Sequence, residues 1–370
     1  MKPKTLLIVI AALAALCVTA WFFNRPVPPP SARDPRINQP LLTSSDATNL
    51  ASLQLTDQGN TVLLTRPSAS SGWQVASNHD LPADFPKLAT LVQTLTATRI
   101  ERLVTSTPDR LARLGFSDTT LTASDASGQP LLVLTLGKDA DGGGRYLRFA
   151  NESKAYLARL ETAFDTDSTN WTDSTLLRFS PADIAKVTFA FPSPLFVSRA
   201  SATAPFTTDA TPAGQRLKTD TVNSLLSTLS TLRFLQTSEP TDPQATGARA
   251  SARTVTLTTF DGKTITVALG RRPEHIVASR YAAHAAPIEF FLRDTAPVPA
   301  ALLGPITEKI PPGPAFAFVT HSDAAAPLNA LMQKRAFQVS EFTLTALPST
   351  AASLFEPVPA APSSPPANTP

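Results

Sequence analysis

The sequence predicts an α+β protein of two tandem similar units, each an antiparallel sheet with one amphipathic helix packed on it, behind an N-terminal transmembrane helix. Three observations predict this architecture: an apolar run at the N-terminus, an amphipathic helical segment that occurs twice, and hairpin-forming strands around each copy. Because hairpins make most of the predicted connections, antiparallel sheets are favoured over a parallel α/β fold.

Residues 1–24 form the predicted signal anchor. Lys2 and Lys4 precede an apolar run from Leu6 to Phe23, which as a helix would span about 27 Å and cross the hydrocarbon core of a bilayer. The two lysines favour a cytoplasmic N-terminus. We therefore expect a single-pass protein of the bacterial inner (cytoplasmic) membrane, with the bulk of its chain in the periplasm.

Two alternatives compete with an uncleaved anchor. Val18-Thr19-Ala20 is a possible signal-peptidase site, but the apolar run continues beyond it through Phe23. Cys17 is a possible lipidation site, but Leu16 before it is larger than the small residue that such a site needs. We expect the uncleaved anchor. Cys17 is also the only cysteine of the chain, which excludes an intramolecular disulfide and a cysteine-based zinc site.

Composition shifts along the chain predict the boundaries of its parts. Six prolines between Pro26 and Pro40 indicate a stiff, extended spacer. The end of the chain is rich in Ala, Pro and Ser and too poor in apolar residues to pack, so we predict that it is disordered. The predicted parts are the spacer 25–46, the first α+β unit 47–165, the second α+β unit 166–298, a C-terminal extension 299–346 with a helix at 328–335 and a strand at 338–344, and the tail 347–370.

The repeated helix is the clearest internal signal. Residues 84–100 read DFPKLATLVQTLTATRI, and residues 218–234 read KTDTVNSLLSTLSTLRF. In both copies the apolar residues recur at steps of three and four, which is the stripe of an amphipathic helix. Pro86 is tolerated because it falls in the first turn. We expect the stripe to be buried against the sheet of its own unit at Leu91, Leu95, Leu225 and Leu229.

Strands surround each predicted helix. Trp73 precedes the first helix and Phe206 occupies the same place before the second. In the first unit, Leu136-Gly137 is followed by Arg145-Tyr146, and in the second, Leu269-Gly270 is followed by Arg280-Tyr281. The predicted strands are 51–55, 61–66, 72–76, 99–104, 119–124, 131–136, 146–149 and 155–157 in the first unit, and 184–189, 195–199, 253–259, 264–269 and 290–293 in the second.

This ordered set resembles the bacterial domain-of-unknown-function 4340 family. The resemblance covers about residues 47–294 and includes Leu114-Gly115-Phe116 and the segment DSTLLRFSPADIAKV at 173–187. The second unit departs from the pattern, because a Pro-, Thr- and Ala-rich loop at 239–250 stands in place of a Leu-Gly-Phe element. The resemblance implies a membrane-anchored envelope protein that accompanies ABC-type or gliding-motility transporter components, and it supplies no catalytic residues.

The residues themselves indicate no reaction, cofactor or metal. Charged residues make up 16% of the chain with a net charge of +3 and no clustered basic face, so nucleic-acid binding is not expected. The segment 139–144 is read as a glycine turn, because Ala150 stands where a calcium loop needs glutamate. Asp165 and Asp167 are read as capping residues. The histidines are scattered and no Gly-x-Ser-x-Gly elbow occurs, so we predict a non-enzymatic protein.

The polar–aromatic pairs Arg145-Tyr146 and Arg280-Tyr281 are the candidate site residues. Because neighbouring side chains on a strand face opposite ways, one member of each pair should be buried. The structural interpretation has the tyrosine packed on the sheet and the arginine solvated or ion-paired. The alternative is contact with a ligand or partner.

Three functions are therefore compatible with the sequence. The leading hypothesis is a scaffold or accessory subunit of an envelope ABC-type transporter complex. The second is an envelope module that binds a peptide or glycan through its uncharged Thr/Ser-rich surface. The third, an enzyme of an unrecognised type, would need a pocket where distant polar residues converge.

Overall fold

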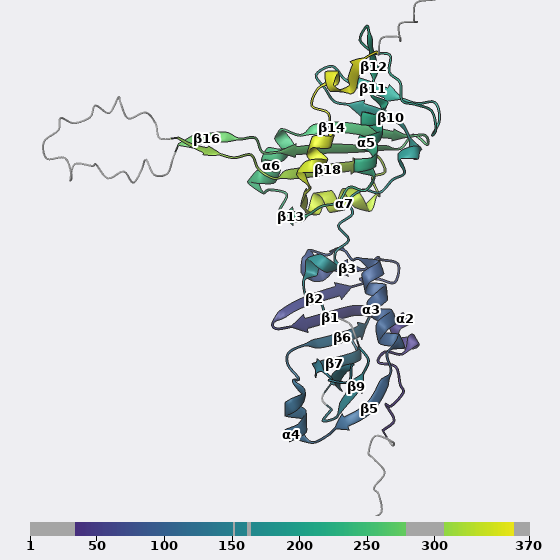
Figure 1. Ribbon diagram of the computed structural model, residues 1–370, viewed down its shortest axis with the longest axis vertical. Helices are drawn as coiled ribbons and strands as arrows, with labels where there is room; N and C mark the ends of the chain where they lie inside the picture. The colour runs from purple at the N-terminus through teal and green to yellow at the C-terminus, as the bar shows by residue number, and fades with distance from the viewer. Residues whose placement is uncertain (1–33, 151, 161–163, 279–306, 359–370) are drawn as a thin grey trace, which may run out of the picture. The chain divides into compact units, whose positions relative to one another are not determined.

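The computed structural model describes residues 34–150, 152–160, 164–278 and 307–358 (Figure 1). It is an α+β protein with antiparallel sheets and few helices, which confirms the predicted fold class. Contacts along the chain define two compact units, Met1–Asp173 and Ser174–Pro370. The predicted anchor lies outside the described residues, and none of the helices within them is long and apolar enough to cross a membrane.

The first unit contains a nine-stranded sheet in the order β4-β3-β2-β1-β6-β7-β8-β9-β5. Hairpins join β1 to β2, β6 to β7 and β7 to β8, as the sequence predicted, and every paired strand runs antiparallel to its neighbour. Its strands are β1 (Leu50–Asp57), β2 (Asn60–Thr65), β3 (Gln74–Val75), β4 (Leu81–Pro82), β5 (Ile100–Thr105), β6 (Thr120–Asp125), β7 (Pro130–Asp139), β8 (Arg145–Phe149) and β9 (Ala155–Ala158).

Helix α3 (Phe85–Ala97) covers the buried side of this sheet. Its N-cap Asp84 accepts a hydrogen bond from the Lys87 amide, and Pro86 lies in the first turn where its missing N–H costs nothing. Leu91 and Leu95 are 4% and 0% exposed within the core that β1, β2, β6 and β7 line. The first copy of the repeated helix is therefore confirmed as a core element. The short helices of the unit are α2 (Ser44–Asn49), η2 (Ala76–Asn78), α4 (Pro108–Leu111), η3 (Ala112–Leu114) and η4 (Ser168–Trp171).

The second unit contains a seven-stranded sheet in the order β11-β10-β14-β15-β18-β19-β13. Helix α5 (Thr219–Ser230) supplies the second copy of the stripe, with Leu225 and Leu229 at 1% and 0% exposure. The helix ends before the predicted residue 234. The strands of the sheet are β10 (Ile184–Phe189), β11 (Leu195–Ser198), β13 (Gln236–Ser238), β14 (Arg253–Thr259), β15 (Thr264–Arg271), β18 (Ala315–His321) and β19 (Ala336–Gln338).

Three features of the second unit correct the sequence prediction. The segment expected as a loop at 239–250 forms α6 (Pro243–Ala250), because Asp242 caps the first turn and Pro243 suits its first position. The expected extension contributes β18 and β19 to the sheet, joined by α7 (Pro327–Lys334). The strand predicted at 338–344 is wrong: most of it is α8 (Glu341–Ala346), capped by Ser340.

The beginning of the predicted disordered tail also carries structure. Residues 351–354 form η9 (Ala351–Leu354), and β20 (Phe355–Pro357) pairs antiparallel with β12 (Gln215–Leu217). Leu354 and Phe355 are buried, so these two apolar side chains provide the packing that the composition of the tail alone did not predict. The other short helix of the unit is η5 (Pro181–Asp183).

A separate two-stranded ribbon lies between β15 and β18 in the chain, although these two strands are neighbours in the sheet. It consists of β16 (His275–Ala278) and β17 (Thr307–Ile310), and Figure 1 shows it outside the seven-stranded sheet. The strand beside β15 is therefore β18, whereas the sequence placed the strand that follows Leu269-Gly270 at Arg280-Tyr281. Those two residues, and the strand predicted at 290–293, lie outside the described residues.

Each sheet contains the same local arrangement of an arginine at a β-bulge. The register shifts after Leu50 in β1 and after Ile184 in β10. Arg66 donates to the Leu50 carbonyl at 2.9 Å, and Arg199 donates to the Ile184 carbonyl at 2.7 Å. The two guanidinium groups stack on the aromatic rings that the sequence had paired, Trp73 at 5.6 Å and Phe206 at 4.6 Å. The arginine thus satisfies a carbonyl that the bulge removes from the strand ladder.

Candidate binding surface on the second sheet

The first candidate pair, Arg145-Tyr146, lies on β8 of the first sheet. The Arg145 Nε donates to the Gly137 carbonyl at 2.9 Å, and its guanidinium lies 3.9 Å from the Asp139 carboxylate and over the ring of Phe164. Tyr146 is half-buried beside Gly137. These contacts fit the structural interpretation of the first pair. Arg280 and Tyr281, the second candidate pair, lie outside the described residues.

A more distinctive set of side chains occupies one side of the second sheet. The register places Thr188 of β10 beside Thr256 of β14, Thr256 beside Thr266 of β15, and Thr266 beside Thr320 of β18. We call these four residues the threonine row and the side of the sheet that carries them the outer face. The neighbouring row across the same strands points the other way, into the core. Its members are all buried: Leu195, Phe189, Val255, Val267 and Val319.

Each end of the threonine row carries a cation stacked on a phenylalanine. At the β11 end, Phe196 pairs with Thr188 and is 50% exposed, and the Lys186 ammonium lies 4.5 Å from the centre of its ring. At the β18 end, the Arg249 guanidinium at the end of α6 lies 4.5 Å from the ring of Phe318. Stacking on the ring holds each long side chain over the sheet while its charge stays in solvent.

No acidic residue balances these cations on the outer face. Strands β10, β11, β14, β15 and β18 contain neither aspartate nor glutamate. Among the described residues, no carboxylate lies within ion-pair distance of Lys186 or Arg249. In the turns that follow β14 and β18, Asp261 pairs with Lys263 at 3.0 Å and the Asp323 carboxylate accepts from the Ala325 amide. Hydrogen bonds from Thr259 and Lys263 lower the pKa of Asp261 to about 2.

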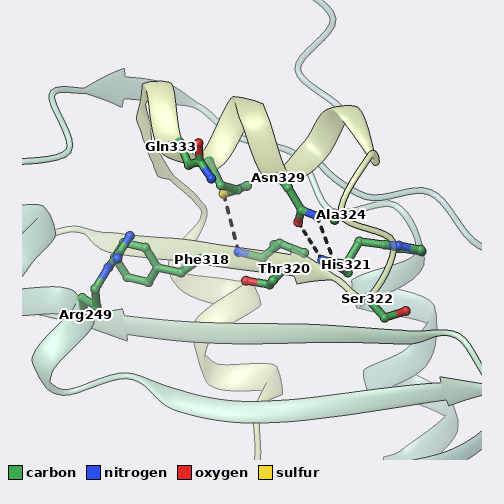
Figure 2. Close-up of a pocket in the computed structure, with 10 residues that line it drawn as sticks. Arg249, Phe318, Thr320, His321, Ser322, Ala324, Asn329 and Gln333 are labelled. Carbon is green, nitrogen blue, oxygen red and sulfur yellow. Dashed lines mark hydrogen bonds between the residues drawn. The ribbon is translucent and has the colours of Figure 1, made fainter.

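A pocket of about 540 Å³ opens at the β18 end of this face (Figure 2). Phe318, Thr320 and Ser322 lie along one wall, and Arg249 stands over Phe318. Helix α7 forms the opposite wall with Asn329, Met332 and Gln333, and Ala324 lies in the turn before this helix. The pocket is therefore open and mainly apolar in its lining, and hydroxyl, amide and guanidinium groups stand among these apolar surfaces as hydrogen-bond donors.

Helix α7 also covers the free edge of β18. The Val319 amide lies 3.5 Å from the Met332 sulfur, and the His321 amide donates to the Asn329 side-chain oxygen at 2.9 Å. The Asn329 amide in turn donates to the His321 carbonyl at 3.0 Å. The backbone groups beyond the short strand β19 thus have side-chain partners, and this edge is closed to the addition of another strand.

The other features considered from the sequence have local roles. Asp167 caps η4, as predicted, whereas Asp165 is not a cap: it pairs with Lys87 and accepts a hydrogen bond from the Asp167 amide. Burial raises the pKa of Asp165, but the hydrogen bonds from Lys87, the Asp167 amide and Asn170, together with the Lys87 charge, outweigh it, so the net shift is downward. His321 accepts from the Asp323 amide through Nδ1, which places its proton on Nε2. Across the part of the chain that the structure describes, no group of three metal-ligating side chains is found.

A second cluster fixes the start of the described chain. The Asp34 side chain is 2% exposed and accepts from the Lys154 ammonium at 2.9 Å and the Tyr156 hydroxyl at 3.1 Å. Arg36 pairs with Glu152 and stacks 4.0 Å from the centre of the Phe149 ring. Backbone amides of the following residues donate hydrogen bonds to the carbonyls of Ile100, Thr98 and Leu95. Because residues 34–42 are held along the first unit in this way, we call them the strap. Two ion pairs therefore hold the strap against the β8–β9 hairpin. The strap supplies the acid in one pair and the base in the other.

The titration of this cluster follows from its burial. Burial raises the pKa of the Asp34 carboxyl, but hydrogen bonds from the Arg36 amide, Lys154 and Tyr156 together outweigh it, so this pKa lies below its ordinary value of 3.8. Burial, followed by the Asp34 charge, raises the pKa of the Tyr156 hydroxyl. At neutral pH the cluster therefore holds an ionised Asp34 and a protonated Tyr156.

Sequence reasoning missed the outer face for identifiable reasons. The alternation Thr254-Val-Thr256-Leu-Thr258 marks one side of β14 as hydroxyl-bearing. The threonine row, however, exists only through the pairing register of four strands, and β18 was not recognised as one of them. Arg249 was missed because its helix was predicted to be a loop.

The sequence profile of the family described as "Domain of unknown function (DUF4340)" matches residues 73–251. This stretch begins at Trp73 and ends directly after α6, so it is narrower than the 47–294 that the resemblance suggested. No curated protein and no solved structure matches the chain. Residues 73–251 of the chain thus match the DUF4340 family, which is the family that the resemblance in its sequence indicated.

Proposed function

We propose that this protein is a non-enzymatic scaffold of the bacterial envelope, held in the inner membrane by residues 1–24 and acting as an accessory subunit of an ABC-type transporter complex. The observation that carries the proposal is the strap. A tethered scaffold needs its chain fixed where the tether enters the folded part. Asp34 and Arg36 provide that attachment within the predicted spacer 25–46, whose residues from Asp34 onward are therefore part of the folded unit and not an extended spacer.

We also infer that the two units are tandem copies of one fold. Reading from β2 and from β11, the sheet orders β2-β1-β6-β7-β8-β9-β5 and β11-β10-β14-β15-β18-β19-β13 place corresponding strands in corresponding positions. The bulges at Leu50 and Ile184, each bound by an arginine, support this pairing. Gly137 and Gly270 support it too, because each lies against the backbone of the helical segment before β6 or β14.

Co-purification tests the scaffold function. The full chain is captured through a C-terminal tag from detergent-solubilised native membranes, and the co-purifying proteins are identified by mass spectrometry. The proposal predicts that a transporter component is recovered with it. A tagged unrelated single-pass protein extracted in parallel measures adventitious capture. Recovery of the chain alone, under detergents that preserve known membrane complexes, would argue against an accessory subunit.

A second candidate function is a binding module for an envelope ligand. The observation that favours it is the outer face of the second sheet, where an exposed phenylalanine, a hydroxyl-bearing row and two cations without acidic partners adjoin a pocket. This function does not exclude the first, because a scaffold can hold a transporter component with one surface and an envelope ligand with another.

A further inference from the structure

We propose that the outer face of the second sheet binds a carboxylated polysaccharide, an inference that rests on the binding-module function. Its elements are the threonine row, Phe196 with Lys186 at one end, and Phe318 with Arg249 at the other. Each element contributes a different part of the recognition of such a ligand.

The two cations of the outer face predict that its ligand carries negative charge. Lys186 and Arg249 extend over the face from opposite ends, and neither has a carboxylate partner among the described residues. The five strands beneath them contain no acid. A ligand that brings carboxylates to both ends therefore gains two charge-assisted hydrogen bonds and meets no like-charge repulsion from the sheet.

The threonine row between the cations indicates how long the ligand is and which polar groups it carries. From β11 to β18 the face crosses four strand spacings, about 19 Å. Threonine presents a hydroxyl that both donates and accepts, next to a methyl group. The exposed ring of Phe196 offers an apolar platform. Sugar rings combine hydroxyl edges with apolar C–H faces, so an extended chain of several uronic-acid-type rings matches this alternation.

The covered edge of β18 favours a polysaccharide over a peptide. An acidic peptide would bind most strongly by adding a strand to a free edge. At the pocket end of the face, Met332 and Asn329 of α7 already cover the edge amides of Val319 and His321. At this end of the face the ligand must then be recognised through side chains, because the covered edge of β18 offers no backbone pairing to a peptide.

Binding is tested with the full chain in nanodiscs of uncharged phospholipid, titrated with polygalacturonate oligomers. The fully methyl-esterified oligomers keep the sugar backbone without its charge, and poly-glutamate keeps the charge without the sugars. We expect saturable binding of polygalacturonate that weakens with salt, and at least tenfold weaker binding of both other polymers. Equal binding of the ester would overturn the role of charge, and equal binding of poly-glutamate would assign the face to an acidic protein partner instead.

Substitutions locate the site. Lys186→Gln and Arg249→Gln are each expected to weaken polygalacturonate binding about fivefold, since each removes one exposed ion pair. Arg148→Gln is the matched control, because Arg148 stacks 5.2 Å from the ring of Phe116 on the first sheet. Equal loss in the control, or none in either variant, would overturn the proposal even when the wild type binds. Thermal unfolding of every variant checks that folding is unchanged, and co-purification of the transporter component is scored separately, so that failure here is distinguishable from failure of the scaffold function.

Discussion

The two units share a strand order but differ in what they add to it. A threonine row crosses the first sheet as well, through Thr61, Thr56, Thr120 and Thr135. On the first sheet, however, the matching strands β1, β2, β6, β7 and β8 carry three aspartates against one lysine and two arginines. The corresponding strands of the second sheet lack aspartate, and the second unit adds α7 and the β16–β17 ribbon. The comparison teaches that the shared parts maintain the fold, whereas charge and insertions distinguish the surfaces.

The largest expected effect comes from the helices that the units share. Leu95→Ala and Leu229→Ala each remove a side chain that is 0% exposed, and each should cost about 2–5 kcal/mol of unfolding free energy. Phe85→Ala is the control on α3, because Phe85 is 61% exposed and should cost little. Denaturant unfolding followed by fluorescence measures the effect. If the leucine variants were as stable as the Phe85 variant, these helices would not be the core of their units.

Replacing the glycine near the end of β7 or of β15 with alanine should lower the unfolding free energy by different amounts. A Cβ on Gly270 would lie 2.2 Å from the Ala248 carbonyl oxygen, and one on Gly137 would lie 2.6 Å from the Leu114 carbonyl oxygen. Both partners are backbone atoms, so we expect Gly270→Ala to cost about 3 kcal/mol and Gly137→Ala somewhat less.

Gly72→Ala is the control for this pair, because a Cβ there meets nothing within 4 Å. The measurement is the unfolding midpoint of each variant. A neutral Gly270→Ala would show that α6 does not approach β15 as closely as described.

The two arginines at the bulges should differ in how much they stabilise their units, in the order of the number of hydrogen bonds that each donates. Arg199 donates to the carbonyls of Ile184, Ala202 and Pro181, whereas Arg66 donates to that of Leu50. Arg199→Met should therefore cost about 2 kcal/mol and Arg66→Met about 1 kcal/mol. Thermal unfolding at neutral pH measures the two differences. Equal costs would mean that the bulge carbonyl alone accounts for the stabilisation.

The strap should make the stability of the first unit depend on the ionisation of Asp34. Because the pKa of Asp34 is lower in the folded chain than its ordinary value of 3.8, its contribution to stability is complete above that value and is lost as the pH falls through the lowered pKa. Asp34→Asn should cost about 1 kcal/mol at pH 7, and this difference should shrink below pH 4.

Unfolding of the wild type and of Asp34→Asn across this pH range measures the difference. Arg216→Gln is the control, since its ion pair with Glu356 in the second unit is exposed. A difference that stayed constant down to pH 2 would show that the Asp34 charge does not hold the strap.

How much of this was accessible from the sequence depends on how local the signal is. The helices around Leu95 and Leu229 were predicted because the spacing of apolar residues that defines each one lies within a single short stretch of the sequence. Helix α8 was predicted to be a strand, because its few apolar residues do not distinguish the period of a strand from that of a helix. The Ser340 side chain caps the first turn and favours the helix. The place of β18 was not predicted, since the β16–β17 insertion separates it from β15. The threonine row depends on that same long-range pairing.

Site-specific photocrosslinking in native membranes tests the central claim, that the second sheet rather than the first carries the binding surface. A benzophenone amino acid replaces Thr320 or Thr61, two exposed threonines that each end a threonine row. We predict a crosslinked product that migrates as a high-mass smear and disappears with polysaccharide-degrading treatment from position 320, and none from position 61. Equal products from both positions, a product from position 61 alone, or none from either would contradict the account.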